Sequence, residues 1–195
     1  MNKWYVFFIC WISWAGKGTL IKWLLKQNIK DLEFVLSCKT REPRNWEIFW
    51  KDYIKLSFEE FQKWIDSQEF LEYNFVHNQD YYWTRKTDII ENWIEKWKIL
   101  LKEIDILIVP TLRKAMKGYE NNYSIIFLDL PIETIKERMA SRWDDTWWED
   151  YKNRVNSASK EKELLHLVDF VIDATKPQAQ VLKETKDIIM NKIEI

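Results

Sequence analysis

The stretch from Trp11 to Leu20 constrains the chain most. It reads Trp-Ile-Ser-Trp-Ala-Gly-Lys-Gly-Thr-Leu and lies between an apolar run, Tyr5–Cys10, and a segment with helical spacing, residues 21–26. A buried strand, a tight turn and a helix in this order are the usual setting of a loop that binds nucleotide phosphates. In such a loop backbone N–H groups surround the phosphates, a lysine neutralises them and a hydroxyl coordinates Mg²⁺. The pattern therefore predicts these roles for Lys17 and Thr19.

Tryptophan stands where this loop needs glycine. The pattern G-x-x-x-x-G-K-[ST] begins with glycine, whereas the chain has Trp11 there and a second tryptophan at position 14. The whole chain has 3 glycines and 13 tryptophans, although average usage predicts roughly 14 glycines at this length. We hypothesise that many of these tryptophans are glycine in the natural protein, through a UGA codon that the organism reads as glycine. The alternative is a genuinely tryptophan-rich protein that has lost catalysis.

Length and charge set further bounds. A chain of 195 residues is expected to form one domain with small insertions. Its net charge of −1 produces no overall field that attracts nucleic acid or a membrane surface, so neither is an expected partner. Two cysteines, Cys10 and Cys38, are too few for a disulfide framework and favour a reducing, cytoplasmic location. The first apolar run is predicted to be a buried strand rather than a signal peptide, and no segment has the length of a membrane span.

Strands and helices alternate over most of the chain. Apolar runs predict strands at residues 5–10, 33–37, 99–104, 124–128 and 169–173, and helical spacing predicts helices at 18–27, 87–96, 111–116, 131–139 and 177–192. Alternation of this kind, with a phosphate loop after the first strand, predicts a parallel sheet with helices on both faces. The fold class is therefore α/β.

The middle of the chain, roughly residues 38–86, follows a different pattern. It is aromatic and strand-rich, with strands expected at 54–56, 70–73 and 80–84 and a helix that Ser57 caps. We interpret it as an inserted substrate lobe. Within it, Arg41 and Arg44 flank Pro43 and suit the bidentate binding of a phosphate, although a solvated charged loop fits these residues equally well. The highly charged residues 142–152 suggest a lid.

Several motifs in the same order resemble the guanylate kinase family over nearly the full length. The family's phosphate loop G-x-S-G-x-G-K-G-T matches residues 11–19 if Trp11 and Trp14 are glycine, and its segment S-C-x-T-R-x-P-R is unbroken at residues 37–44. Further matches are Glu-Phe-Leu-Glu-Tyr at 69–73, Tyr-Tyr-Trp-Thr at 81–84, Glu-Ile-Asp at 103–105 and the trio Arg154, Ala158 and Glu161. Seven tryptophans fall where the family has or commonly has glycine: Trp11, Trp14, Trp46, Trp50, Trp83, Trp97 and Trp143.

The resemblance implies phosphoryl transfer from ATP to GMP, giving ADP and GDP, on a nucleotide-binding parallel sheet with Mg²⁺ as cofactor. It implies a core of residues 1–37 and 87–195, a GMP-binding lobe of about 38–86 and a helical lid of about 138–154. Small-molecule nucleotides are the implied partners.

The resemblance also implies a role for each matched residue. The ATP-binding loop would comprise Trp11, Ile12, Ser13, Trp14, Ala15, Gly16, Lys17, Gly18 and Thr19, with Thr19 as the ligand of Mg²⁺. The catalytic cations would be Lys17, Arg138, Arg142 and Arg154. The phosphate of GMP would be held by Ser37, Arg41, Arg44, Tyr53 and Tyr82, and its guanine edge would be read by Glu72, Thr84 and Asp105. A carboxylate accepts two parallel hydrogen bonds from guanine N1–H and N2–H₂, which adenine cannot offer.

Two other functions remain open from the sequence. If Trp11 and Trp14 are real, we expect a distorted loop or an occluded phosphate site, which would suit a catalytically inactive interaction module that binds peptides. A related kinase acting on another small phosphorylated substrate is the third reading, and the guanine-reading residues argue against it. The sequence departs from the family pattern at four places: Lys39 in place of a small hydroxyl residue, the segment Asn78-Gln79-Asp80, which is one residue longer than usual, Ile106-Leu107-Ile108 after Asp105, and Asp173 near the expected adenine site.

Overall fold

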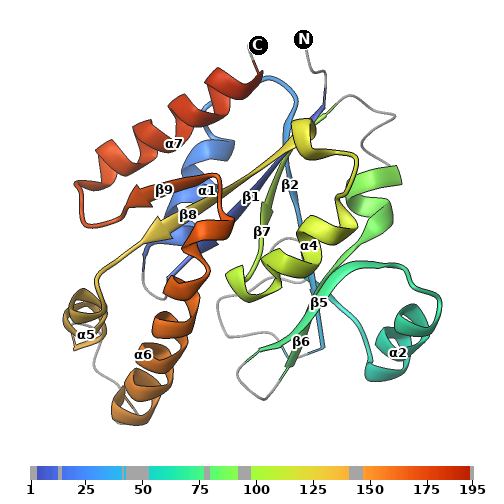
Figure 1. The fold of residues 1–195 in the computed structure, drawn as a ribbon, viewed down its shortest axis with the longest axis horizontal. Helices are drawn as coiled ribbons and strands as arrows, with labels where there is room; N and C mark the ends of the chain where they lie inside the picture. The colour runs from blue at the N-terminus through green and yellow to red at the C-terminus, as the bar shows by residue number, and fades with distance from the viewer. Residues whose placement is uncertain are drawn as a thin grey trace.

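A parallel sheet of five strands forms the centre of the molecule (Figure 1). The computed structural model describes residues 4–12, 15–40, 42, 53–76, 80–91, 98–140 and 147–193. The strands are β1 (Tyr5–Trp11), β2 (Leu32–Val35), β7 (Ile99–Glu103), β8 (Tyr123–Asp129) and β9 (Phe170–Asp173), arranged in the order β2-β7-β1-β8-β9. All four pairings are parallel. The predicted α/β fold class and all five predicted strands of this sheet are confirmed.

Strand β1 is central because its residues are apolar without alternation. Every side chain from Val6 to Cys10 is fully buried, as expected for a parallel strand covered on both faces. Phe7 lies opposite Leu101 of β7 on one side and Ser124 of β8 on the other. The main hydrophobic core surrounds this strand and fixes the position at which the phosphate loop begins.

Helices α1 (Lys17–Leu25) and α7 (Gln178–Ile193) contact each other beside the sheet (Figure 1). The other described α-helices of this part are α4 (Val109–Ala115), α5 (Ile132–Ala140) and α6 (Trp147–Glu163). Short 3₁₀ turns lie at Ile106–Ile108, Glu120–Asn122 and Leu165–Leu167. Among the described residues, no helix combines the length and the apolar composition that crossing a membrane requires.

The aromatic middle of the chain forms a second sheet of four strands. These are β3 (Ser37–Lys39), β4 (Tyr53–Lys55), β5 (Phe70–Val76) and β6 (Asp80–Arg85), in the order β4-β3-β6-β5. Helix α2 (Phe58–Asp66) packs on this sheet around a small core of Cys38, Phe61, Phe70 and Trp83. In Figure 1 the second sheet and α2 lie at one lower corner of the molecule, and the pair α5–α6 lies at the other. The strand-rich character predicted for this region is confirmed, whereas the predicted boundaries of lobe and lid stay predictions.

One predicted helix differs in the structure, and the predicted lid is described only in part. The helix expected over residues 87–96 starts as a π-helical turn, η1 (Thr87–Glu91), and residues 92–97 lie outside the described residues. Of the charged stretch 142–152, residues 147–152 belong to the continuous helix α6, and 142–146 lie outside the described part.

Candidate functional site

The described part of the predicted phosphate loop has a backbone that suits an anion site. Ile12 donates its N–H to the carbonyl of Leu128 (3.1 Å), and Ala15 donates back to Ile12 (3.1 Å). Gly16 then adopts a φ of +91°, which glycine reaches without the steric cost of a Cβ atom. This glycine immediately precedes α1, so the N-terminal N–H groups and the positive end of the helix dipole face the end of the loop.

The predicted ATP-loop residues are placed only in part. Ile12 and Ala15 are buried, Gly18 and Thr19 are exposed on the first turn of α1, and Trp11 is half-buried against the main core. Ser13 and Trp14 lie outside the described residues, as does the side chain of Lys17, the first residue of α1. The expectation that two indoles occlude the phosphate site therefore stays a prediction.

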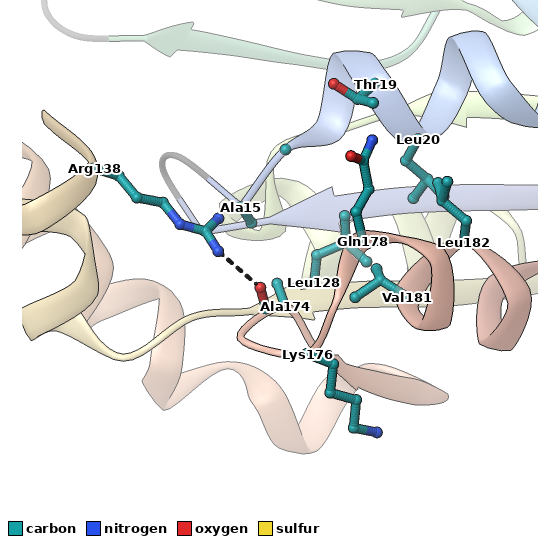
Figure 2. A pocket seen from close by; sticks show the side chains of 11 residues that line it. Ala15, Thr19, Leu20, Leu128, Arg138, Ala174, Lys176, Gln178, Val181 and Leu182 are labelled. Carbon is teal, nitrogen blue, oxygen red and sulfur yellow. Dashed lines mark hydrogen bonds between the residues drawn. The ribbon is translucent and has the colours of Figure 1, made fainter. Parts of the chain in front are cut away.

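A cavity of about 270 Å³ opens beside this loop (Figure 2). Its wall combines Ala15 and Thr19 of the loop and α1 with residues of the α7 region, among them Lys176, Gln178 and Leu182. Arg138 reaches the cavity from α5 and donates from Nη2 to the carbonyl of Ala174 (3.0 Å). The cavity thus has a cationic end next to the phosphate loop and an apolar side formed by α1 and α7.

Arg138 is the one predicted lid cation whose side chain can be placed in the described part of the chain. Arg142 lies outside the described residues, and Arg154 belongs to α6 with an undescribed side chain. The structure therefore brings Arg138 to the phosphate loop and leaves the other two assignments as predictions.

Lys176 and Gln178 line the cavity but were not among the predicted site residues. A turn after β9 places them: Asp173 Oδ1 accepts hydrogen bonds from the Thr175 N–H (2.8 Å) and hydroxyl (2.6 Å), which lower the pKa of the Asp173 carboxyl. Lys176 also pairs with Glu184 (2.9 Å). The signal in the sequence was the order Asp-x-Thr followed by Pro177 and a helix, because such an Asp turn at the end of a parallel strand aims the next residues at the ligand edge.

The second sheet carries several of the predicted GMP-binding residues. Ser37, Tyr53, Glu72 and Thr84 all lie on its strands, and all are buried. Glu72 and Thr84 are register partners on β5 and β6, and the Thr84 hydroxyl donates to Glu72 Oε1 at 2.6 Å. Two of the three residues that were predicted to read the guanine edge are thus in direct contact. They form what we call the Glu72–Thr84 pair.

Asp105, the third predicted base-reading residue, follows β7 and caps the 3₁₀ turn that leads into α4. Its Oδ1 accepts the N–H of Leu107 at 2.9 Å, which explains how Ile106-Leu107-Ile108 form an ordered turn after this aspartate. The charge of Asp105 also acts on Glu72 and raises the pKa of that carboxyl. Asp105 therefore belongs to the same electrostatic environment as the Glu72–Thr84 pair.

Burial dominates the protonation of Glu72. It raises the pKa of this carboxyl from 4.5 to about 7, against the hydrogen bond from Thr84 and the positive charge of Lys102, both of which lower it. Glu72 is consequently ionised in mildly alkaline solution and protonated in mildly acidic solution. Only the ionised form offers both oxygens as acceptors to a purine edge.

The remaining predicted acceptor residues are placed less completely. Arg41 and Arg44 lie outside the described residues, and Tyr82 lies on β6 with an undescribed side chain. Tyr53 is fully buried, and the amine of Lys39 lies 4.9 Å from the centre of its ring. Lys39, the departure from the family pattern, thus packs against a predicted ligand-binding tyrosine.

Lys102 is a buried cation that sequence reasoning missed. It is fully buried on β7 and donates to the hydroxyl of Ser37 (2.9 Å) and the carbonyl of Val35 (3.4 Å). The signal was a lysine within the apolar strand 99–104, because lysine is almost never fully buried unless it is paired.

Known proteins resemble this chain over most of its length. The sequence model of the family described as guanylate kinase matches residues 8–192 of the chain. The guanylate kinase of Helicobacter pylori strain 26695 is 34% identical over 180 residues, covering 91% of this chain and 84% of the relative. The guanylate kinase of Clostridium tetani is 32% identical over 195 residues, covering 100% of this chain and 90% of the relative.

A solved structure supports the fold. The crystal structure of guanylate kinase from Anaplasma phagocytophilum has a TM-score of 0.71 and 19% sequence identity, covering 100% of this chain and 86% of that one. At this identity the similarity shows the shared fold. Since the family match spans nearly the whole chain and the relatives are matched over most of their length, the chain belongs to the guanylate kinase family.

Proposed function

We propose that this protein transfers the terminal phosphoryl group of ATP to GMP, giving ADP and GDP. Curated relatives named guanylate kinase match over most of their length, and their activity is the one that the geometry suits. ATP would occupy the cavity beside the phosphate loop, and GMP would bind over the second sheet. Free buried thiols at Cys10 and Cys38 suit the cytoplasmic location that forms part of the proposal.

The observation that carries the proposal is the Glu72–Thr84 pair. Both side chains are buried at paired positions of neighbouring strands, and the Thr84 hydroxyl already donates a hydrogen bond of 2.6 Å to Glu72. A carboxylate of this kind would accept the two donors of a guanine edge, while an adenine edge would leave it unpaired. The cost of unpaired buried groups is the physical basis of the base selectivity that we propose.

The donor side would work by charge neutralisation and alignment. Backbone N–H groups of the loop at Gly16 and the first turn of α1 would hold the phosphates, with Lys17 as the counter-charge. Arg138 already reaches the cavity from α5. Arg142 and Arg154 complete the proposed cationic cluster, which would stabilise the transferring group as the lid region closes.

The residues at the loop suit Mg²⁺ as the cofactor. In the described part of the chain no group of three or more His, Cys, Asp and Glu side chains could hold a metal, and Thr19 presents an exposed hydroxyl on α1. Mg²⁺ is typically held by substrate phosphates, water and one or two protein oxygens rather than by an all-protein cage. Thr19 would supply such an oxygen, and the ion would neutralise phosphate charge.

A comparison of acceptors tests this function. The protein is incubated with ATP and Mg²⁺ and either GMP or AMP, and the nucleotides formed are separated and quantified. We expect ADP and GDP in equal amounts and a kcat/KM for AMP lower by about a thousand-fold or more, because the site would reject a base that leaves its polar groups unpaired. Equal use of AMP and GMP would favour a kinase of different specificity. GMP binding without any ADP formation would favour the inactive module.

A further inference from the structure

A buried lysine joins the two sheets of the molecule. Lys102 lies on β7 of the five-stranded sheet, opposite Val35 of β2. Its amine extends to Ser37, where the chain leaves β2 and enters β3 of the second sheet. The proposed reaction assigns no role to this side chain. Burying a lysine amine costs free energy unless nearby groups compensate for it.

The compensating groups come from several elements. Negative charge on Glu72 of β5, Glu103 of β7 and Asp88 of η1 favours the charged form of Lys102, as does the Cys38 thiol of β3. Burial opposes them and lowers the pKa of the Lys102 amine below its usual value. In return, Lys102 lowers the pKa of Glu72, while Asp105 raises it. Arg85 acts on the same cluster through Asp88 and Cys38.

The hydrogen bond to Ser37 has a directional consequence. The Ser37 oxygen accepts from Lys102 at 2.9 Å, so its single proton must point elsewhere. That proton points at Glu103 Oε1 over 3.5 Å, which is the outer limit of a hydrogen bond and therefore a weak one. A phosphate oxygen, which only accepts, would take the proton in its place. Lys102 thus leaves the Ser37 hydroxyl ready to donate to an anion.

We propose that Lys102 is a positioning residue of the acceptor site, which aims the Ser37 hydroxyl at the acceptor phosphate. This inference rests on the proposed function, because it assigns the phosphate to Ser37. It adds a residue that touches neither ligand and acts through Ser37, to which it donates a hydrogen bond.

The main test is Lys102→Met, which keeps an unbranched chain of similar size and removes the charge and the donors. We expect the KM for GMP to rise about ten-fold near neutral pH, as for the loss of a hydrogen bond to a charged group, while the KM for ATP stays within about two-fold. The pH profile of kcat/KM for GMP is the decisive readout. Its acidic limb should move to higher pH, because Glu72 loses a positive charge that lowers its pKa.

Two further variants separate the two effects. Ser37→Ala should raise the KM for GMP without moving the acidic limb. In the double variant with Lys102→Met, the rise in the KM for GMP should be clearly smaller than the product of the two single rises. Lys102→Gln keeps a donor for Ser37 without the charge, so it should move the acidic limb with a smaller rise in KM. It also serves as the test variant if Lys102→Met does not fold. Removing one member of a buried charge cluster can be strongly destabilising, so the folded state of each variant is checked first.

Lys98→Met is the matched control. Lys98 immediately precedes the same strand but pairs with Glu33 and is 30% exposed, so its loss should change neither the KM for GMP nor the pH profile. This inference alone would be overturned if the wild type is active and a folded Lys102→Met or Lys102→Gln variant has the same KM for GMP and the same pH profile as the wild type. A wild type that neither binds nor phosphorylates GMP would overturn the proposed function, and this inference with it.

Discussion

The protonation state of Glu72 is expected to make GMP binding depend on pH. Its pKa of about 7 means that the carboxylate which would accept the guanine edge is fully formed only above neutral pH. We expect the KM for GMP to fall as the pH rises from about 6 to about 8, because deprotonation supplies the second acceptor. Steady-state kinetics with GMP as the varied substrate measure this directly.

The substitution Glu72→Gln tests the origin of that pH dependence. An amide keeps the shape of the side chain but offers one acceptor, so we expect kcat/KM for GMP to fall about 30-fold or more and the step near pH 7 to disappear. The phosphate of GMP itself titrates near pH 6, and its contribution should persist in the variant. Glu69→Gln is the control, since Glu69 is 40% exposed and pairs with Arg85 at 3.8 Å. A step near pH 7 that survives Glu72→Gln would assign it to another group.

The sequence motifs predicted that Glu72 and Thr84 belong to one site, but the buried charge of Lys102 near them was not predicted. The motifs at 69–73 and 81–84 placed Glu72 and Thr84 in one site, and strand pairing then made them neighbours. Lys102 escaped prediction because a strand with both faces buried is expected to carry apolar side chains throughout. Only the turn from β2 into β3 shows that this lysine reaches Ser37.

Among the helices, α2 has an N-terminus that is defined by a capping sequence. Ser57 accepts the N–H of Glu60 (3.2 Å), and Glu60 accepts the N–H of Ser57 (2.8 Å), which completes a capping box. We expect Ser57→Ala to lower the free energy of unfolding by about 1 kcal/mol, measured by urea denaturation. Ser67→Ala at the other end of α2 removes a hydroxyl that donates only to carbonyls of the last turn. It should cost clearly less, and equal losses would show that the capping box is not the stabilising feature.

Elements with a clear period or cap were the ones predicted correctly. The strands of the central sheet and helices α1, α2 and α7 appear within a few residues of their predicted bounds. The π-helical turn η1 was not predicted, because hydrophobic spacing alone does not distinguish a π-turn from the start of an α-helix. The cavity residues of the α7 region were missed for a related reason: they come from a turn whose direction depends on the hydrogen bonds of Asp173.

Trp83 shows how the tryptophans enter the packing of an element. Its ring is buried on β6, with its centre 4.6 Å from that of Phe61 and 5.5 Å from that of Phe70. Its indole N–H is buried without a hydrogen-bond partner in the described structure. The second sheet and α2 therefore have room for the indole ring, but their described residues offer no acceptor for its N–H. This lowers the free energy of unfolding by an amount typical of an unpaired buried donor. Glycine at this position, as hypothesised, would remove that cost together with the packing.

For the whole molecule, the decisive question is whether positions 11 and 14 carry tryptophan in the protein that the organism makes. The backbone around them already has a strand end at Trp11, a glycine at φ +91° and a helix N-terminus. Phosphates need close approach to such a backbone, and we predict that indole side chains at these two positions would fill that space. We expect the natural protein to have a lower intact mass than the printed sequence, with glycine at both positions in peptides covering residues 4–26.

Two recombinant proteins test whether the residues at positions 11 and 14 determine ATP binding and activity. The printed chain and the double variant Trp11→Gly/Trp14→Gly are compared for ATP binding by calorimetry and for phosphorylation of GMP. We expect the double variant to bind ATP with Mg²⁺ at least about ten-fold more tightly, because backbone donors regain access to the phosphates. Trp23→Gly, on α1 outside the loop, controls for the removal of an indole alone and should give no gain. Tryptophan at both positions in the natural protein would refute the recoding hypothesis. ATP binding by the printed chain that is as tight as that of the double variant would show that the loop binds nucleotide with its indoles in place.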